Sequence, residues 1–147
     1  MSEATLTYRG TVQAWHCDHM GHMNVMWYVG KFDEATWTMF ELIGVTGAYM
    51  REQKRGMAAV QQNITYSREL MAGDTLTVRT RLLEIRERVI RFEHVMHIGG
   101  TDEIAARCEI TGVHLDRVTR KATPFPADVV ARGRRLVAAP APALAEA

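Results

Sequence analysis

The sequence predicts an α+β domain in which one long helix lies against an antiparallel sheet of about five strands. Two patterns predict this class. From Val25 to Ile43, apolar residues recur at the three- and four-residue spacing of an amphipathic helix. Beyond residue 56 the apolar residues alternate, as in half-buried strands. A strand, a long helix and then four strands favour a sheet with the helix on one face.

The first expected strand covers residues 5–15, which are rich in Thr, Tyr and Val. Polar residues 16–24 are expected to form a loop. Asn24 stands where a helix N-cap is expected, and Gly44 stands where a helix often ends. The long helix therefore covers residues 25–43.

Gly30 lies inside this helix, where Gly costs about 1 kcal/mol relative to Ala. Its presence suggests close packing against another backbone. A shorter helix is expected over residues 45–54, ended by Gly56.

Four strands are expected after residue 56, with turns at residues 72–74 and 99–100. In three of them, the residues expected to share one face are Val60, Gln62, Ile64 and Tyr66; Leu76, Val78, Thr80 and Leu82; and Ile104, Ala106, Cys108 and Ile110. The remaining strand covers residues 88–97. Residues 1–137 are thus expected to form one domain, and the Ala/Pro-rich tail at 138–147 is expected to be disordered.

Composition excludes several classes of protein. Apolar residues make up 47% of the chain, charged residues make up 24%, and the net charge is +1. Interspersed charges of both signs give no broad surface for nucleic acid or an anionic membrane. Two cysteines are too few for a disulfide framework, and the N-terminal residues lack the layout of a signal peptide. We expect a reduced, cytoplasmic protein.

The stretch from Asp18 to Asn24 carries the clearest chemistry. The Asp18 carboxylate is either a nucleophile or a general base that activates water, or it is a turn carboxylate stabilised by the helix dipole. His22 is either a proton-transfer group near neutral pH or a structural loop residue. Asn24 caps the helix and supports the other two.

The start of the helix adds hydrogen-bond donors to this carboxylate. The backbone N–H groups of Val25, Met26 and Trp27 have no acceptors within the helix. Together with the helix dipole, such groups bind an anion or a polarised carbonyl oxygen. A carboxylate beside these donors is the arrangement that attack on a carbonyl requires.

Other kinds of site are disfavoured. His16, His19 and His22 have the spacing of metal ligands on a helix, but the expected loop disrupts that geometry. The chain contains no HExxH, CxxC, GxSxG or P-loop motif. We therefore expect neither a metal nor an organic cofactor.

Two segments of the chain resemble a known family, the hotdog-fold acyl-CoA thioesterases of the 4-hydroxybenzoyl-CoA thioesterase type. The first is Asp18-x-x-Gly21-His22-x-Asn24-x-x-x-Tyr28, followed by Phe32-Asp33-x-Ala35. The second is Ile64-Thr65-Tyr66-Ser67-Arg68-Glu69-Leu70-x-x-Gly73-Asp74-x-Leu76. The resemblance covers roughly residues 5–125.

The resemblance implies a sheet wrapped around the long helix, dimers or tetramers, and active sites between subunits. It places Asp18 on the catalytic carboxylate and Val25 on the residue whose backbone N–H polarises the thioester carbonyl. His22 matches a histidine of related acyl-carrier-protein thioesterases, although Met20 replaces the Asn of their motif. Acyl-CoA is the implied substrate.

Substrate-binding residues are expected on the helix and after the next strand. Met26, Tyr28 and Val29 either line an acyl pocket or pack in the core, and Arg68 either meets the phosphates of coenzyme A or is solvated. The same choice applies to three further basic residues, Arg117, Arg120 and Lys121. Two alternative functions remain, an acyl-carrier-protein thioesterase and a non-catalytic acyl-CoA binder.

Overall fold

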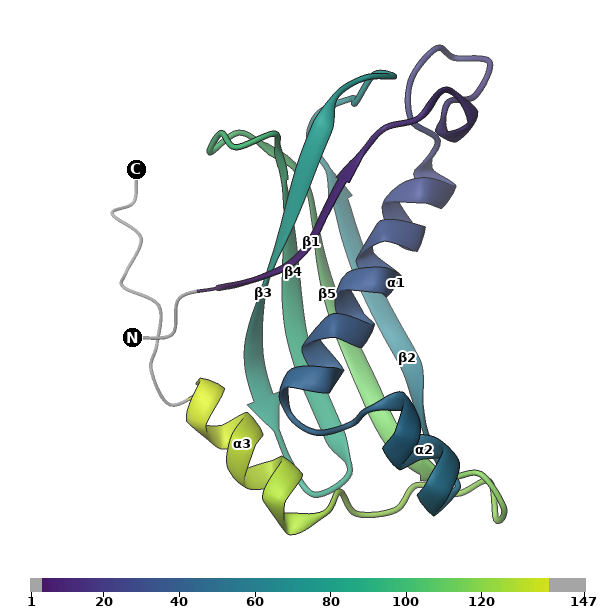
Figure 1. Cartoon of the computed structure of the whole chain (residues 1–147), viewed down its shortest axis with the longest axis vertical. Coiled ribbons are helices and arrows are strands. Elements are labelled where there is room, and N and C mark those ends of the chain that lie inside the picture. The colour runs from purple at the N-terminus through teal and green to yellow at the C-terminus, as the bar shows by residue number, and fades with distance from the viewer. Residues whose placement is uncertain (1–3, 138–147) are drawn as a thin grey trace.

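The computed structural model describes residues 4–137, which form a five-stranded antiparallel sheet wrapped around one long helix (Figure 1). The strands are β1 (Thr5–Thr11), β2 (Arg55–Tyr66), β3 (Thr75–Ile85), β4 (Val89–Ile98) and β5 (Ile104–Asp116), in the order β1-β3-β4-β5-β2. The helices are α1 (Val25–Leu42), α2 (Gly47–Gln53) and α3 (Ala127–Val137), with a short 3-10 helix at Ala14–His16. The predicted fold class is confirmed, while the expected tail at 138–147 lies outside the described residues.

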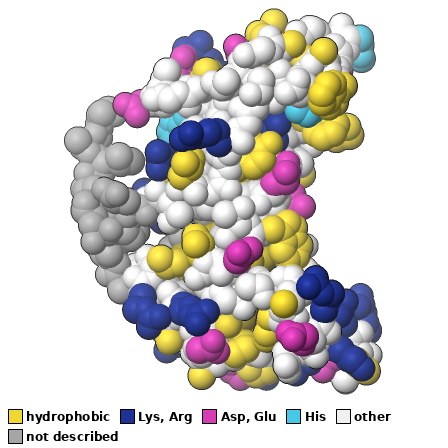
Figure 2. Space-filling view, viewed as in Figure 1, with side chains coloured by type: hydrophobic (Ala, Val, Ile, Leu, Met, Phe, Trp, Pro, Cys, Tyr) yellow, Lys and Arg dark blue, Asp and Glu magenta, His cyan; other side chains and the backbone are white. Residues whose placement is uncertain are grey.

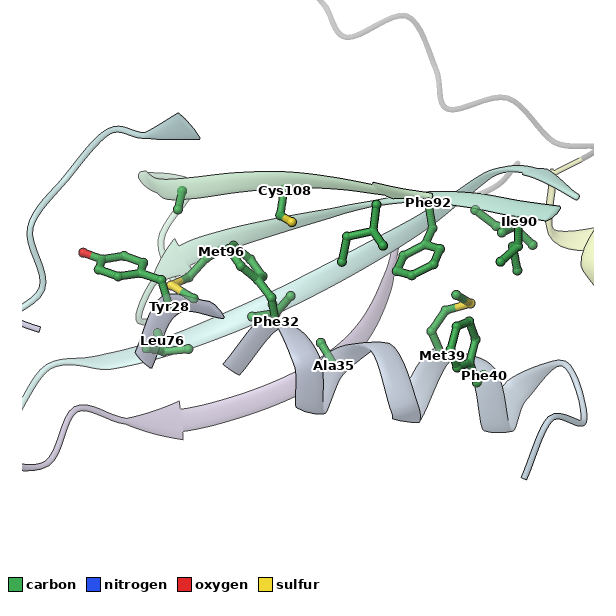
Figure 3. Close-up of a cluster of buried hydrophobic side chains, with 14 of the residues drawn as sticks. Tyr28, Phe32, Ala35, Met39, Phe40, Leu76, Ile90, Phe92, Met96 and Cys108 are labelled. Atoms are coloured by element: carbon green, nitrogen blue, oxygen red, sulfur yellow. The ribbon is translucent and has the colours of Figure 1, made fainter. Parts of the chain in front are cut away.

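Helix α1 begins at the predicted residue, Val25, and ends at Leu42, one residue before the predicted end. The Asn24 side chain accepts a hydrogen bond from the Met26 backbone N–H at 2.9 Å, and Gly44 follows the helix with a φ of +96°. One face of α1 is buried against the sheet (Figure 3). Its side chains Tyr28, Phe32, Ala35, Met39 and Phe40 point toward Leu76, Ile90, Phe92, Met96 and Cys108. Alternation along β3 is also confirmed, because Leu76, Val78, Thr80 and Leu82 are all buried.

Two expected element ends and one expected strand face are wrong. Strand β1 ends at Thr11, because the backbone N–H of Gln13 donates to His16 Nδ1 and closes the 3-10 helix. Helix α2 covers Gly47–Gln53, because Lys54 caps it with a left-handed φ of 54°, and Gly56 already belongs to β2. Val60 is the extra residue of a β-bulge, so it does not share the alternating face of β2.

Helix α3 is missing from the sequence prediction. It packs against β3 and beside Gly44, which follows α1 (Figure 1), with Val129 buried at 2% exposure. Six of its 11 residues are apolar, but the helix is short and has Gly133 in its interior, which weakens a prediction of helix. A Cβ on Gly133 would lie 2.9 Å from the Ile85 side chain, so this glycine permits the close approach of the helix.

Gly30 does not have the role that the sequence suggests. Within the described part of the chain, a Cβ at this position would meet only the Trp27 ring, at 3.7 Å. We therefore expect Gly30→Ala to raise the free energy of unfolding by about 0.5–1 kcal/mol, since Ala is the better helix former. Urea denaturation would measure this change. Gly133→Ala is the matched control and should destabilise the protein, because Ile85 blocks its Cβ.

A buried hydrogen-bond chain crosses the core from β1 to α1. Thr7 Oγ1 lies 2.7 Å from Thr80 Oγ1, which lies 2.7 Å from His94 Nδ1, and His94 Nε2 lies 2.8 Å from Thr36 Oγ1. Thr36 donates its own hydroxyl proton to the carbonyl oxygen of Phe32. His94 must therefore donate from Nε2 and accept at Nδ1, as a neutral imidazole. Burial lowers the pKa of His94 to about 3.

Among the described residues, no helix has both the length and the hydropathy needed to span a membrane.

Candidate active site

The loop before α1 is folded tightly around Asp18. The Asp18 backbone N–H donates to the carbonyl oxygen of His22 at 3.2 Å, and the Gly21 N–H donates to that of Asp18 at 2.9 Å. Gly21 has a φ of +90°, a conformation that other residues rarely adopt. This turn brings Asp18 back toward the residue that caps α1.

The Asp18 carboxylate is held by two donors. Asn24 Nδ2 donates to Oδ2 at 2.7 Å, and the Met20 backbone N–H donates to Oδ1 at 2.8 Å. These hydrogen bonds lower the pKa of Asp18 below its usual range, and the bond from Asn24 has the larger effect. The carboxylate is therefore ionised at neutral pH, as a general base or nucleophile must be.

One N–H at the start of α1 remains available. Asn24 Oδ1 accepts from Met26 N, and the Asn24 carbonyl oxygen accepts from Trp27 N at 2.9 Å. In residues 4–137, the Val25 N–H has no hydrogen-bond acceptor. The expectation of three free donors is thus reduced to one, and Asn24 joins that donor to Asp18.

A second segment, residues 67–70, packs beside the loop. Met23 N donates to the Leu70 carbonyl oxygen at 2.7 Å, and the Tyr28 hydroxyl donates to that of Arg68 at 2.9 Å. A pocket of about 230 Å³ lies between the two segments. It is lined by His22, Met23, Val25, Tyr28, Tyr66, Ser67, Arg68 and Glu69. Hydrophobic side chains and histidines gather at this end of the molecule, where α1 begins (Figure 2).

His22 faces both the pocket and an acidic residue. Its Nε2 lies 3.5 Å from a carboxylate oxygen of Glu69, and its Nδ1 lies 3.5 Å from the carbonyl oxygen of Met23. The side chain is 26% exposed, so it can meet a bound molecule or water. Asp18 does not line the pocket of the single chain.

The remaining expected residues are divided between two ends of the molecule. Tyr28 and Arg68 line the pocket, whereas Met26, which is 61% exposed, and Val29 do not. Arg117 contacts the carbonyl oxygen of Met50 near the start of β2, while the pocket lies at its end. Because β2 has 12 residues, these ends are about 35–40 Å apart. Arg117 therefore cannot reach the same part of a ligand as Arg68 within one chain.

His16 packs in the interior of the protein and is not placed as a metal ligand would be. It is buried, accepts from Gln13 N and packs on the Trp27 ring at 4.5 Å between centroids. Nowhere in the described chain do three His, Cys, Asp or Glu side chains converge as metal ligands would.

Four pocket residues were not predicted from the sequence, namely Met23, Tyr66, Ser67 and Glu69. The last three follow the pocket's first residue, His22, by more than 40 positions. Their only signal was their place in the second segment of the family resemblance. The contacts of Met23 and Tyr28 with the backbone of residues 67–70 bring them to the site.

Asn24→Ala is expected to impair both stability and chemistry. It removes the cap of α1, which should lower the free energy of unfolding by about 1 kcal/mol, and it removes a donor to Asp18. Thermal denaturation and acyl-CoA hydrolysis would be measured together. Thr46→Ala is the matched control, because Thr46 caps α2 through the Tyr49 N–H, far from Asp18. Equal activity loss in both variants would contradict a local role for Asn24.

Comparison with known proteins places this geometry in a class. The model of the Thioesterase-like superfamily matches residues 12–133, which include the loop, α1 and the complete pocket. The chain has the hotdog fold. It belongs to the Thioesterase-like superfamily.

Curated relatives are similar over most of the chain. The betainyl-CoA thioesterase of Pseudomonas aeruginosa is 24% identical over 139 residues, which cover 95% of this chain and 87% of that protein. The L-carnitine dehydrogenase/betainyl-CoA thioesterase of Rhizobium meliloti is 29% identical over 119 residues, or 81% of this chain. The chain spans only 24% of the length of the Rhizobium protein.

Solved structures show the same fold. A thioesterase from Thermus thermophilus, crystallised with coenzyme A and zinc, superposes with a TM-score of 0.79 at 22% identity, covering 96% of this chain and all of that one. A Staphylococcus aureus protein solved with CoA has a TM-score of 0.85 at 18% identity, with 92% and 85% coverage.

Proposed function

We propose that this protein is an acyl-CoA thioesterase that uses Asp18 and the start of α1. The observation that carries the proposal is the position of Asn24, which holds the Asp18 carboxylate with one side-chain atom and caps α1 with the other. This link through Asn24 supports a role for the Asp18 anion together with the free N–H of Val25. Family membership supports the same chemistry.

In the proposed reaction, the thioester carbonyl oxygen accepts a hydrogen bond from Val25 N–H, which stabilises the negative charge that develops there. Asp18 takes a proton from a water molecule as its oxygen attacks the carbonyl carbon. The carbon–sulfur bond then breaks, and the CoA sulfur takes up a proton that His22 donates from the pocket wall. Products are a free acid and CoA.

Direct attack by Asp18 is the alternative pathway, with a mixed anhydride as its intermediate. Because both carboxylate oxygens already accept hydrogen bonds, we favour the general-base pathway. A pre-steady-state burst of CoA equal to the enzyme concentration would indicate the anhydride instead.

We further propose that two chains pair through β2. This strand lies at an edge of the sheet, and residues on its inner face, Gln62 and Tyr66, are exposed in the single chain. A long exposed edge is normally covered or paired. Pairing would bring a partner surface to the pocket, which adjoins Tyr66. Sedimentation velocity at micromolar concentration tests this, and a monomer with full activity would contradict it.

Thiol release from acyl-CoAs tests the function directly. Wild-type protein would be assayed with acetyl-, betainyl-, benzoyl- and palmitoyl-CoA, because betainyl-CoA is the substrate named for the curated relatives. We expect turnover of at least one of the short acyl groups. Hydrolysis of acyl-carrier-protein thioesters alone would indicate the first alternative, and saturable binding without any hydrolysis would indicate an acyl-CoA binder.

A further inference from the structure

The pocket has an aromatic wall that is held in place from behind. The Tyr66 ring is 45% exposed and contacts Tyr28 edge to face, with 5.2 Å between ring centroids and 84° between planes. Tyr28 is itself buried, and its hydroxyl is bonded to the backbone of Arg68. Tyr66 therefore offers a supported ring to whatever enters the pocket.

The charged groups around this ring leave a negative charge facing the pocket. Arg68 is paired with Glu103, which lies outside the lining, so its positive charge is compensated. Glu69 is 68% exposed and has His22 as its neighbour at 3.5 Å. That distance exceeds a normal hydrogen bond, so the Glu69 carboxylate remains able to interact with a ligand.

The pocket is small in the single chain, before the proposed partner surface is added. Its volume of about 230 Å³ is below the range of about 300–1,000 Å³ that is usual for drug-sized ligands. A short, compact group fits this space better than a long acyl chain.

We propose that this pocket selects short acyl groups that carry a positive charge, with Tyr66 and Glu69 as the residues that recognise the charge. An aromatic face and a carboxylate are the groups that bind quaternary ammonium ions, because both present negative potential. An uncharged acyl group gains only apolar contact with the ring and no electrostatic attraction from either residue. This inference rests on the proposed thioesterase function, since the pocket adjoins Val25.

Two substrates of the same shape provide the test. Betainyl-CoA carries a trimethylammonium group, and 3,3-dimethylbutyryl-CoA replaces that nitrogen with carbon and has no charge. We expect wild-type kcat/KM to be about 10-fold or more higher for the charged substrate. The ratio of the two values is the measurement, because any effect of a variant on the shared chemical step cancels.

Four variants assign the selectivity to residues. Glu69→Gln and Tyr66→Leu should each reduce the ratio by about 3- to 10-fold, whereas Tyr66→Phe keeps the ring and should retain the ratio. Glu52→Gln removes an exposed carboxylate from α2, away from the pocket, and should leave the ratio unchanged.

Equal kcat/KM for the two substrates in the wild type would overturn the inference, and so would a ratio insensitive to both Glu69→Gln and Tyr66→Leu. Preference for benzoyl-CoA over betainyl-CoA would also overturn it, in favour of aromatic stacking. In each of these cases the proposed thioesterase function would stand. Absence of hydrolysis with every thioester would instead reject that function.

Discussion

Asp18→Asn is expected to lower kcat/KM for acyl-CoA hydrolysis by about 100-fold or more. The amide cannot take a proton from water, and general-base catalysis typically contributes about 10²- to 10⁴-fold. The amide would also place one NH₂ group against that of Asn24, where the carboxylate now accepts a hydrogen bond. Initial rates of thiol release over a range of acyl-CoA concentrations would measure the loss.

The control for this variant is Asp33→Asn, which neutralises an exposed carboxylate on α1 that accepts a hydrogen bond from the Trp37 ring N–H. It should retain wild-type kcat/KM. Circular dichroism melts of both variants would establish that they are folded. Activity of Asp18→Asn within threefold of the wild type would reject the proposed base and the nucleophilic alternative together.

Acidification is expected to destabilise the protein through His94. The pKa of His94 is about 3 in the folded state and about 6.5 in the unfolded state, so the unfolded chain binds more protons between these values. The stabilisation is complete above pH 6.5 and is lost as the pH falls toward 3. From pH 7 to pH 4 the free energy of unfolding should fall by about 3 kcal/mol from this residue.

His94→Gln isolates this contribution, because glutamine keeps a donor and an acceptor but does not titrate. Burial also lowers the pKa values of His16, His97 and His114, which add to the acid sensitivity of both proteins. The difference between the urea-denaturation stabilities of wild type and variant should therefore shrink by about 3 kcal/mol between pH 7 and pH 4. A difference that is constant with pH would show that His94 is not held neutral.

Sequence periodicity predicted the elements that pack on the core, because burial imposes a regular spacing on them. The buried face of α1 and the alternation of β3 follow directly from this rule. Helix α3 was not predicted because it is short and contains Gly133, which is unfavourable in a helix interior. The bulge at Val60 and the left-handed Lys54 depend on backbone geometry that carries no residue signature here.

For the candidate site, the sequence placed the capping Asn24 and the nearby Asp18, since their relation is local in the chain. It could not show that the Asn24 side chain joins the carboxylate to the helix, nor that Glu69 lies against His22. Those contacts depend on how residues 67–70 dock, which is a matter of tertiary packing. The catalytic roles themselves remain predictions.

The hydrogen-bond chain through His94 also determines where α1 sits along its own axis. Thr36 is 11 residues beyond Val25, so it anchors the helix to β3 and β4 about 16 Å from the Val25 amide. Sliding the helix by one residue would break that anchor and shift the amide by about 1.5 Å. A displacement of about 1 Å can slow a reaction 100-fold. The buried hydrogen bonds of His94 thus fix the axial position of the Val25 amide, the proposed donor to the thioester carbonyl.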